Sequence, residues 1–313
     1  MLSRVAESLY WMTRYLERAE NISRYIEVNW HMTLEQPDME CGEWGALIST
    51  TGDANLFHES FEIYNRKNVL HFLLFDASYA HSVISCLRAA RENARTIREF
   101  LAVEIWELVN GFYHMVETAG KNRDSIYENP SDFCQQAKLR GMTLCGALNE
   151  TILHGEGWHF TRLGRYLERA DKTTRILDVK YFILKPDSDY TIANYDYVRW
   201  AGLLRACGGL DAYRQKYGRV IPNNVVEFLF FEPNFARSVF HCLREGQRSL
   251  HAITGTPLGE FQNRAERLLG RLYADLAYIR IEDVFETGVH EYTDRLQKRM
   301  NEIHEAVWES FFQ

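Results

Sequence analysis

The segment RYLERAENISRYIEV at residues 14–28 returns as RYLERADKTTRILDV at residues 165–179. Eight of the fifteen positions are identical, and the acidic positions 20/171 and 27/178 keep their charge as Glu/Asp pairs. Matches of this length within one chain indicate an internal repeat, which has to be recognised before a fold is assigned.

A second matched pair follows in the same order. Residues 72–88 are FLLFDASYAHSVISCLR and residues 228–244 are FLFFEPNFARSVFHCLR, with nine of seventeen positions identical. The offsets of the two pairs, 151 and 156 residues, are nearly equal. We therefore predict a tandem duplication, with a first helical repeat at residues 1–152 and a second at 153–313, packed as one globular unit.

The repeated segments have the periodicity of an α-helix. Apolar residues recur at helical spacing along one stripe of the first copy; these are Met12, Tyr15, Ala19, Ile22 and Ile26. Long helices are also expected at residues 77–101 and 234–253, and only 6 prolines and 19 glycines interrupt the chain. The sequence predicts an all-α protein, a large helical bundle made of two pseudo-twofold-related repeats.

Composition excludes several functional classes. The formal net charge of −7 argues against a protein that binds the nucleic-acid backbone, because such proteins concentrate Lys and Arg. No apolar run is long enough for a membrane span, no CxxC pair occurs, and no export signal is recognisable at the N-terminus. We expect a cytoplasmic protein with reduced thiols. Nucleotide-binding loops are not found. Glu156 and His159 have the spacing of a carboxylate-bridged di-iron motif, but such a site needs two of these motifs and the sequence has no second one, so we expect no cofactor and no metal.

Charged residues accompany the stripe in both copies. In the first copy, Glu17, Glu20 and Arg24 share an arc roughly opposite the apolar stripe, and Arg14 and Arg18 flank it. The second copy keeps Arg165, Glu168, Arg169, Asp171 and Arg175. Three interpretations remain open. The charges form a solvated face with weak ion pairs, a buried network that sets helix register, or a polar cavity that binds a ligand or partner.

The same segments resemble a known bacterial family. RYLERAE, GRYLERAD, ARENARTIRE at residues 90–99 and EFLFFEPNFARSVFHCL at 227–243 are similar to the Alpha-E family, which is named for a helical domain with a Glu-Arg motif. The resemblance runs from Met1 to about residue 255. On this chain the motif residues are Glu17, Arg18, Glu168 and Arg169.

The resemblance implies a companion role. Proteins of this family accompany circularly permuted ATP-grasp amidoligases and transglutaminase-like peptidases, and some are fused to them. We therefore expect a helical accessory or binding subunit that acts with such a partner in peptide or amide-bond modification, without catalytic activity of its own, and homo-oligomerisation is left open. The alternative is a self-contained enzyme or small-molecule-binding protein with a polar cavity lined by the two Glu-Arg motifs. Its candidate residues are Arg14, Glu17, Arg18, Arg24, Arg165, Glu168, Arg169 and Arg175.

A row of arginines is a separate candidate for anion binding. Arg88, Arg91, Arg95 and Arg98 recur at i, i+3, i+7 and i+10 on one expected helix. Guanidinium groups suit phosphate or carboxylate. The opposing interpretation is an ordinary charged face, in which Glu92 and Glu99 neutralise Arg88 and Arg95 four residues away.

Overall fold

The computed structural model of the chain confirms the all-α prediction. It describes residues 1–35, 40–183 and 193–313, and every regular element in these residues is a helix. Side chains are described throughout these ranges, except at residues 35, 40–43, 179–183 and 193–196. Within the described residues, no helix combines the length and apolar character that crossing a membrane requires.

The chain divides into two compact units, and the boundary falls inside the first helix. The N-terminal unit is Trp11–His154, and the C-terminal unit joins Met1–Tyr10 to Gly155–Gln313. The tandem repeat of residues 1–152 and 153–313 stays a prediction.

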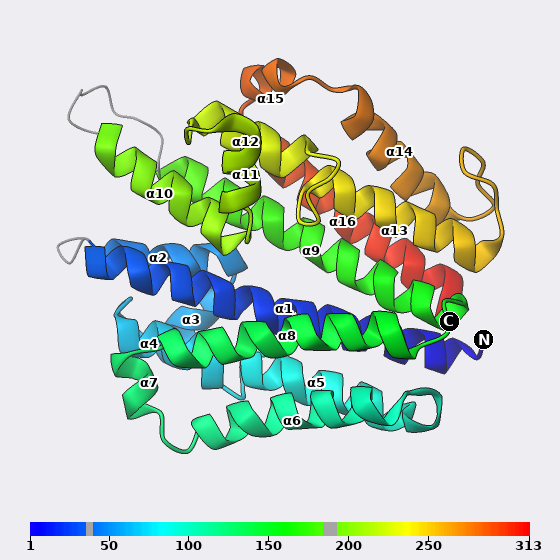
Figure 1. Ribbon diagram of the computed structural model, residues 1–313, viewed down its shortest axis with the longest axis horizontal. Coiled ribbons are helices and arrows are strands. Elements are labelled where there is room, and N and C mark those ends of the chain that lie inside the picture. The colour runs from blue at the N-terminus through cyan, green and yellow to red at the C-terminus, as the bar shows by residue number, and fades with distance from the viewer. Residues whose placement is uncertain (36–39, 184–192) are drawn as a thin grey trace. The chain divides into compact units, whose positions relative to one another are not determined.

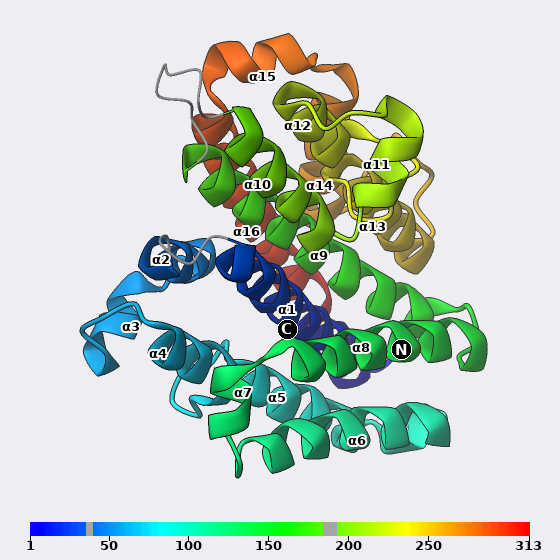
Figure 2. The same cartoon turned by 60° about the vertical axis from the view of Figure 1, so that its left-hand side comes forward.

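Among its described residues, the N-terminal unit contains most of α1 and nine further elements. Their bounds are α1 Ser3–Glu35, α2 Glu40–Thr51, α3 Ala54–Ser60, α4 Arg66–Leu70, the π-helix η2 His71–Phe75, α5 Val83–Thr96, the 3₁₀-helix η3 Arg98–Phe100, α6 Val103–Ala119, α7 Asp124–Glu128 and α8 Ser131–Thr151. Helix α6 packs against both α5 and α8 (Figure 2). The core beneath them is apolar, with Leu87, Ala94 and Phe112 fully buried.

The C-terminal unit is built around one long helix. Its elements are α9 Glu156–Ile183, α10 Ala193–Ala206, α11 Leu210–Tyr217, α12 Pro222–Phe231, α13 Val239–Thr254, α14 Arg264–Tyr278, α15 Ile281–Thr287 and α16 Val289–Phe311. Helices α13 and α16 both run along α9 (Figure 1). At Gly246 on α13, an added methyl group would make ordinary van der Waals contacts of 3.9 Å with Leu163, Leu167 and Leu269.

Two helices begin later than the sequence predicts. The helices expected at residues 77–101 and 234–253 start at Val83 and Val239, after turns at residues 76–82 and 232–238. The reason is capping, since Ser82 Oγ accepts a hydrogen bond from the Ser85 amide and Ser238 Oγ accepts one from the His241 amide. A serine that caps the start of a helix has an extended backbone conformation, so the helix begins only after it.

The two turns share the same hydrogen bonds, and we call them the capped turns. Ser82 Oγ donates to the Asp76 carbonyl at 2.6 Å, and Ser238 Oγ donates to the Glu232 carbonyl at 2.5 Å. The acidic side chain that opens each turn also accepts a backbone amide two residues later. Local structure therefore follows the sequence match between residues 72–88 and 228–244.

Candidate functional site

The Glu-Arg motifs are buried. Glu17 is 3% exposed and Glu168 is 0% exposed, and the paired arginines Arg18 and Arg169 are also buried. Glu20 and Asp171 share this environment. The interpretation of these charges as a solvated face is therefore wrong, because the helices that carry them are covered on the polar side as well as on the apolar side.

Each motif arginine reaches a capped turn of its own unit. Arg18 Nη1 lies 2.7 Å from His81 Nδ1, in the turn before α5. Arg169 Nη1 donates to the Ala236 carbonyl at 3.4 Å, in the turn before α13. The two repeated segments of each half thus meet at the motif arginine, and this contact ties the long helix to the start of the next matched helix.

The motif glutamates have partners one helical turn further on. Glu17 Oε1 accepts a hydrogen bond of 2.9 Å from Asn21 Nδ2. At the matching position of the second copy, Lys172 Nζ lies 3.5 Å from Glu168 Oε1. Buried carboxylates need such partners, because an unpaired charge in the interior is costly.

The other acidic residues of the repeat form intrahelical ion pairs. Arg24 Nη2 lies 2.7 Å from Glu20 Oε1, and Arg175 Nε lies 2.8 Å from Asp171 Oδ2. Burial alone would raise the pKa of Asp171, but the positive charges of Lys172 and Arg175 outweigh it and hold that pKa below its ordinary value. Asp171 therefore stays ionised in the interior.

The remaining candidates of the motif lie beside aromatic rings. The Arg14 guanidinium carbon is 5.2 Å from the centre of the Trp11 ring, and that of Arg165 is 5.0 Å from the centre of the Tyr166 ring. Arg14 belongs to the N-terminal unit and Arg165 to the C-terminal unit. A cavity lined by both Glu-Arg motifs stays a prediction.

The arginine row of residues 88–98 does not form on one helix. Helix α5 ends at Thr96, and Arg98 lies on the short η3. Glu92 pairs with Arg95 at 2.5 Å and with Arg91 at 3.6 Å, so the prediction that it neutralises Arg88 is wrong. Arg91 Nε donates to Asn110 Oδ1 at 2.6 Å. The positive charges of Arg91 and Arg95, in the middle of the row, are therefore partly neutralised.

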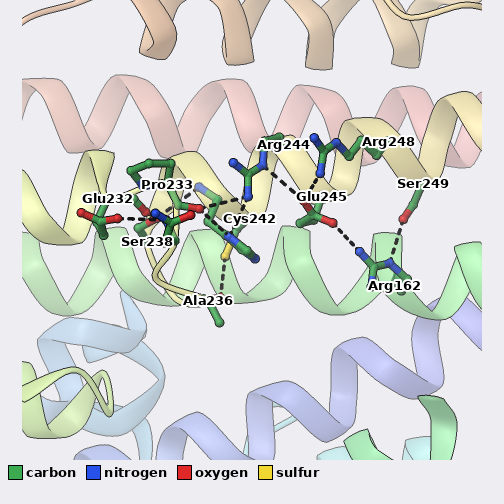
Figure 3. A network of polar contacts seen from close by, with 12 residues as sticks. Arg162, Glu232, Pro233, Ala236, Ser238, Cys242, Arg244, Glu245, Arg248 and Ser249 are labelled. Atoms are coloured by element: carbon green, nitrogen blue, oxygen red, sulfur yellow. Dashed lines mark hydrogen bonds and ion pairs between the residues drawn. The ribbon is translucent and has the colours of Figure 1, made fainter. Parts of the chain in front are cut away.

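A second group of arginines, which the sequence analysis missed, converges on one carboxylate in the C-terminal unit (Figure 3). Arg162 Nη2 lies 2.5 Å from Glu245 Oε2, Arg248 Nη1 lies 2.8 Å from Oε1, and Arg244 Nε lies 3.2 Å from Oε1. We call Arg162, Arg244, Arg248 and Glu245 the arginine cluster. Its sequence signal was the spacing of Arg244 and Arg248 on α13, four residues apart with Glu245 between them.

The surroundings of the arginine cluster hold its guanidinium groups in place. Arg162 Nε donates to Ser249 Oγ at 3.3 Å, and its guanidinium stacks near Trp158 and Tyr166 at 4.5 and 5.0 Å. Arg244 Nη2 donates to the Pro233 carbonyl at 3.0 Å, in the capped turn. Burial raises the pKa of Glu245, but the three arginines outweigh it and bring the net pKa below its ordinary value.

Comparison with known families identifies one that covers nearly the whole chain. The model of the Alpha-E family, described as a predicted alpha-helical domain with a conserved ER motif, matches residues 1–312. The chain is 24% identical over 323 residues to uncharacterized protein Mb2597 of Mycobacterium bovis and to uncharacterized protein Rv2567 of Mycobacterium tuberculosis. Each match covers 97% of this chain and 35% of the relative, so the chain spans about a third of the length of these relatives. No solved structure matches the chain.

Proposed function

The chain belongs to the Alpha-E family, and from this premise we propose that it is a helical accessory subunit that acts with an ATP-grasp amidoligase or a transglutaminase-like partner. The assembly would modify peptides or form amide bonds, with the reaction carried out by the partner.

The proposal rests mainly on the length of the relatives. The segment that matches this chain makes up 35% of each of the two mycobacterial relatives, so there the helical domain is joined to a longer polypeptide. Joining two modules in one chain raises their effective concentration and favours their interaction. The arrangement in the relatives supports a helical domain that works beside other protein modules.

The position of the Glu-Arg motifs also supports an accessory role. Arg18 and Arg169 contact the capped turns, and Glu17 and Glu168 contact side chains one turn along their own helices. The arginine contacts connect the two repeated segments of the same unit, and the glutamate contacts lie within the long helix. Residues used in this way stabilise a scaffold that a partner can bind.

An affinity pull-down tests the proposal. The tagged full chain is recovered from a lysate of its native cells at low salt, and the bound proteins are identified and quantified; a tagged unrelated helical protein is the control. We expect an ATP-grasp or transglutaminase-like protein at near-stoichiometric amounts, and a higher ligation or hydrolysis rate for that partner when the chain is added back.

The opposite outcome is equally informative. A tagged chain that recovers no such protein at low salt counts against the accessory role. The alternative, a self-contained enzyme or small-molecule-binding protein that uses the Glu-Arg motifs, would then be tested by screening the purified chain for ligands.

A further inference from the structure

The arginine cluster carries more positive charge than its one carboxylate balances. Three guanidinium groups share Glu245, which leaves a surplus of two positive charges at one place on a chain whose formal net charge is −7. Like charges held this close repel one another. The surplus therefore favours an additional anion at this position.

The guanidinium groups are prepared for such an anion. A guanidinium carries five N–H donors in a fixed plane, and Arg248 uses only Nη1, toward Glu245, within the described part of the chain. Arg248 is 56% exposed, whereas the Arg162 and Arg244 side chains are 17% and 23% exposed. In the cluster, neighbouring groups hold Arg162 and Arg244 in place. Arg248 faces solvent and has N–H donors available for an anion.

The matching positions of the first half do not form this cluster. At the sequence offsets of the repeated segments, Arg162 corresponds to Trp11, Glu245 to Ala89 and Arg248 to Glu92. Glu92 there neutralises Arg91 and Arg95. A contact needed only for the stability of the long helix would serve both halves equally, so the difference indicates a property specific to the second half.

From this geometry we infer that the arginine cluster on α9 and α13 binds a phosphate dianion, free or as the terminal phosphate of a nucleotide. Two negative charges match the surplus, and several acceptor oxygens match guanidinium donors that come from different directions. Glu245 already holds all three side chains in the free protein, so little conformational freedom is lost when the anion binds. This inference is independent of the proposed accessory function.

Calorimetric titration of the full chain tests the inference. The probes are inorganic phosphate, ATP without Mg²⁺, and adenosine as the phosphate-free control, all at one constant ionic strength because salt screens such contacts. The variants are R248Q, R248K, and R264Q as the matched control. Arg264 is also exposed on the C-terminal unit but pairs with one carboxylate, Glu309, at 2.7 Å.

The expected result is saturable phosphate binding by the wild type, about tenfold weaker binding by R248Q, and an unchanged affinity in R264Q, since a tenfold change corresponds to one charge-assisted contact. R248K is expected to fall between them, because it keeps the charge but loses the planar donors. Binding of phosphate alone identifies the free anion as the ligand, and binding of ATP alone identifies the nucleotide.

Two results would overturn the inference. One is a wild-type chain that binds neither phosphate nor ATP. The other is binding that R248Q and R264Q weaken equally, because the anion would then interact with the general charge of the protein and not with this cluster.

Discussion

Gly141 on α8 approaches Glu20 on α1 so closely that a methyl group on its Cα would lie 2.6 Å from Oε2 of Glu20. The same methyl group would lie 2.9 Å from both Cδ and Cγ, so the conflict involves most of the side chain and not only its end. Glu20 is buried and holds Arg24, which limits its freedom to move aside. The absence of a side chain at residue 141 therefore allows α8 to pack on the Glu-Arg helix.

We expect G141A to destabilise the protein by about 1–2 kcal/mol, although alanine is ordinarily the better residue inside a helix. The matched control is G146A on the same helix, where an added methyl group meets nothing within 4 Å. G146A should stabilise by roughly 0.5–1 kcal/mol. Urea unfolding measures both changes, and an equal gain in the two variants would mean that Glu20 moves freely.

Removing the carboxylate of the arginine cluster should be costly. We expect E245Q to lower the free energy of unfolding by about 1–3 kcal/mol, because three half-buried or exposed guanidiniums lose their shared partner. The control is E309Q, whose exposed pair with Arg264 should contribute much less because solvent screens it. Thermal unfolding compares them, and equal losses would show that the cluster is no more than a surface ion pair.

Because the two capped turns have the same hydrogen bonds, we expect alanine substitution of their serines to cost the same stability. S82A and S238A each remove a buried hydroxyl that caps a helix and also donates to a backbone carbonyl. We expect each to cost about 1–2 kcal/mol, whereas S85A, whose hydroxyl makes only a 3.5 Å contact, should cost little. A large loss in one serine variant and none in the other would contradict the structural equivalence of the turns.

Two histidines should change stability with pH in opposite directions. Burial, with the charge of Arg244, lowers the pKa of His241, so its contribution to stability is present above the ordinary value of 6.5 and is lost as the pH falls below it. The hydrogen bond and the charge of Asp178 raise the pKa of His290, so its contribution is present below 6.5 and is lost as the pH rises through the folded value.

Unfolding curves across this pH range test both signs. The wild type should lose stability relative to H241N as the pH falls below 6.5. Relative to H290N, it should gain stability as the pH falls from above the raised pKa of His290 toward 6.5. If stability depended on pH in the same way in the wild type and in both variants, these histidines would not be the cause of the pH dependence.

Substitution of Glu168 tests whether the Glu-Arg motif has a structural or a functional role. It is 0% exposed and 3.5 Å from Lys172 Nζ, so we expect E168Q to cost about 2–3 kcal/mol by leaving a buried positive charge less well paired. The exposed Glu150 on α8 supplies the control, E150Q. If E168Q unfolds like the wild type but no longer supports the partner's activity, the motif has a functional role instead.

Much of the secondary structure was accessible from the sequence because helical periodicity is local. The stripe from Met12 to Ile26 predicted a helix, and α1 contains it at Ser3–Glu35. The expected helices at 77–101 and 234–253 began too early, since apolar spacing does not reveal where a serine turns its side chain back to cap the backbone. Ser82 and Ser238 were part of the matched segments, but only the structure shows their hydrogen bonds.

The sequence by itself determined the helical class, the internal match and the family, because all three depend on residues that are near each other in the chain or can be compared directly. The tertiary structure alone decided which charges are buried and which meet. A helical wheel gives the direction of Glu17 or Glu168 but not what packs against that side of the helix. Arg162 and Glu245 are 83 residues apart, and their contact exists only because α9 and α13 pack side by side and bring their arginines to one carboxylate.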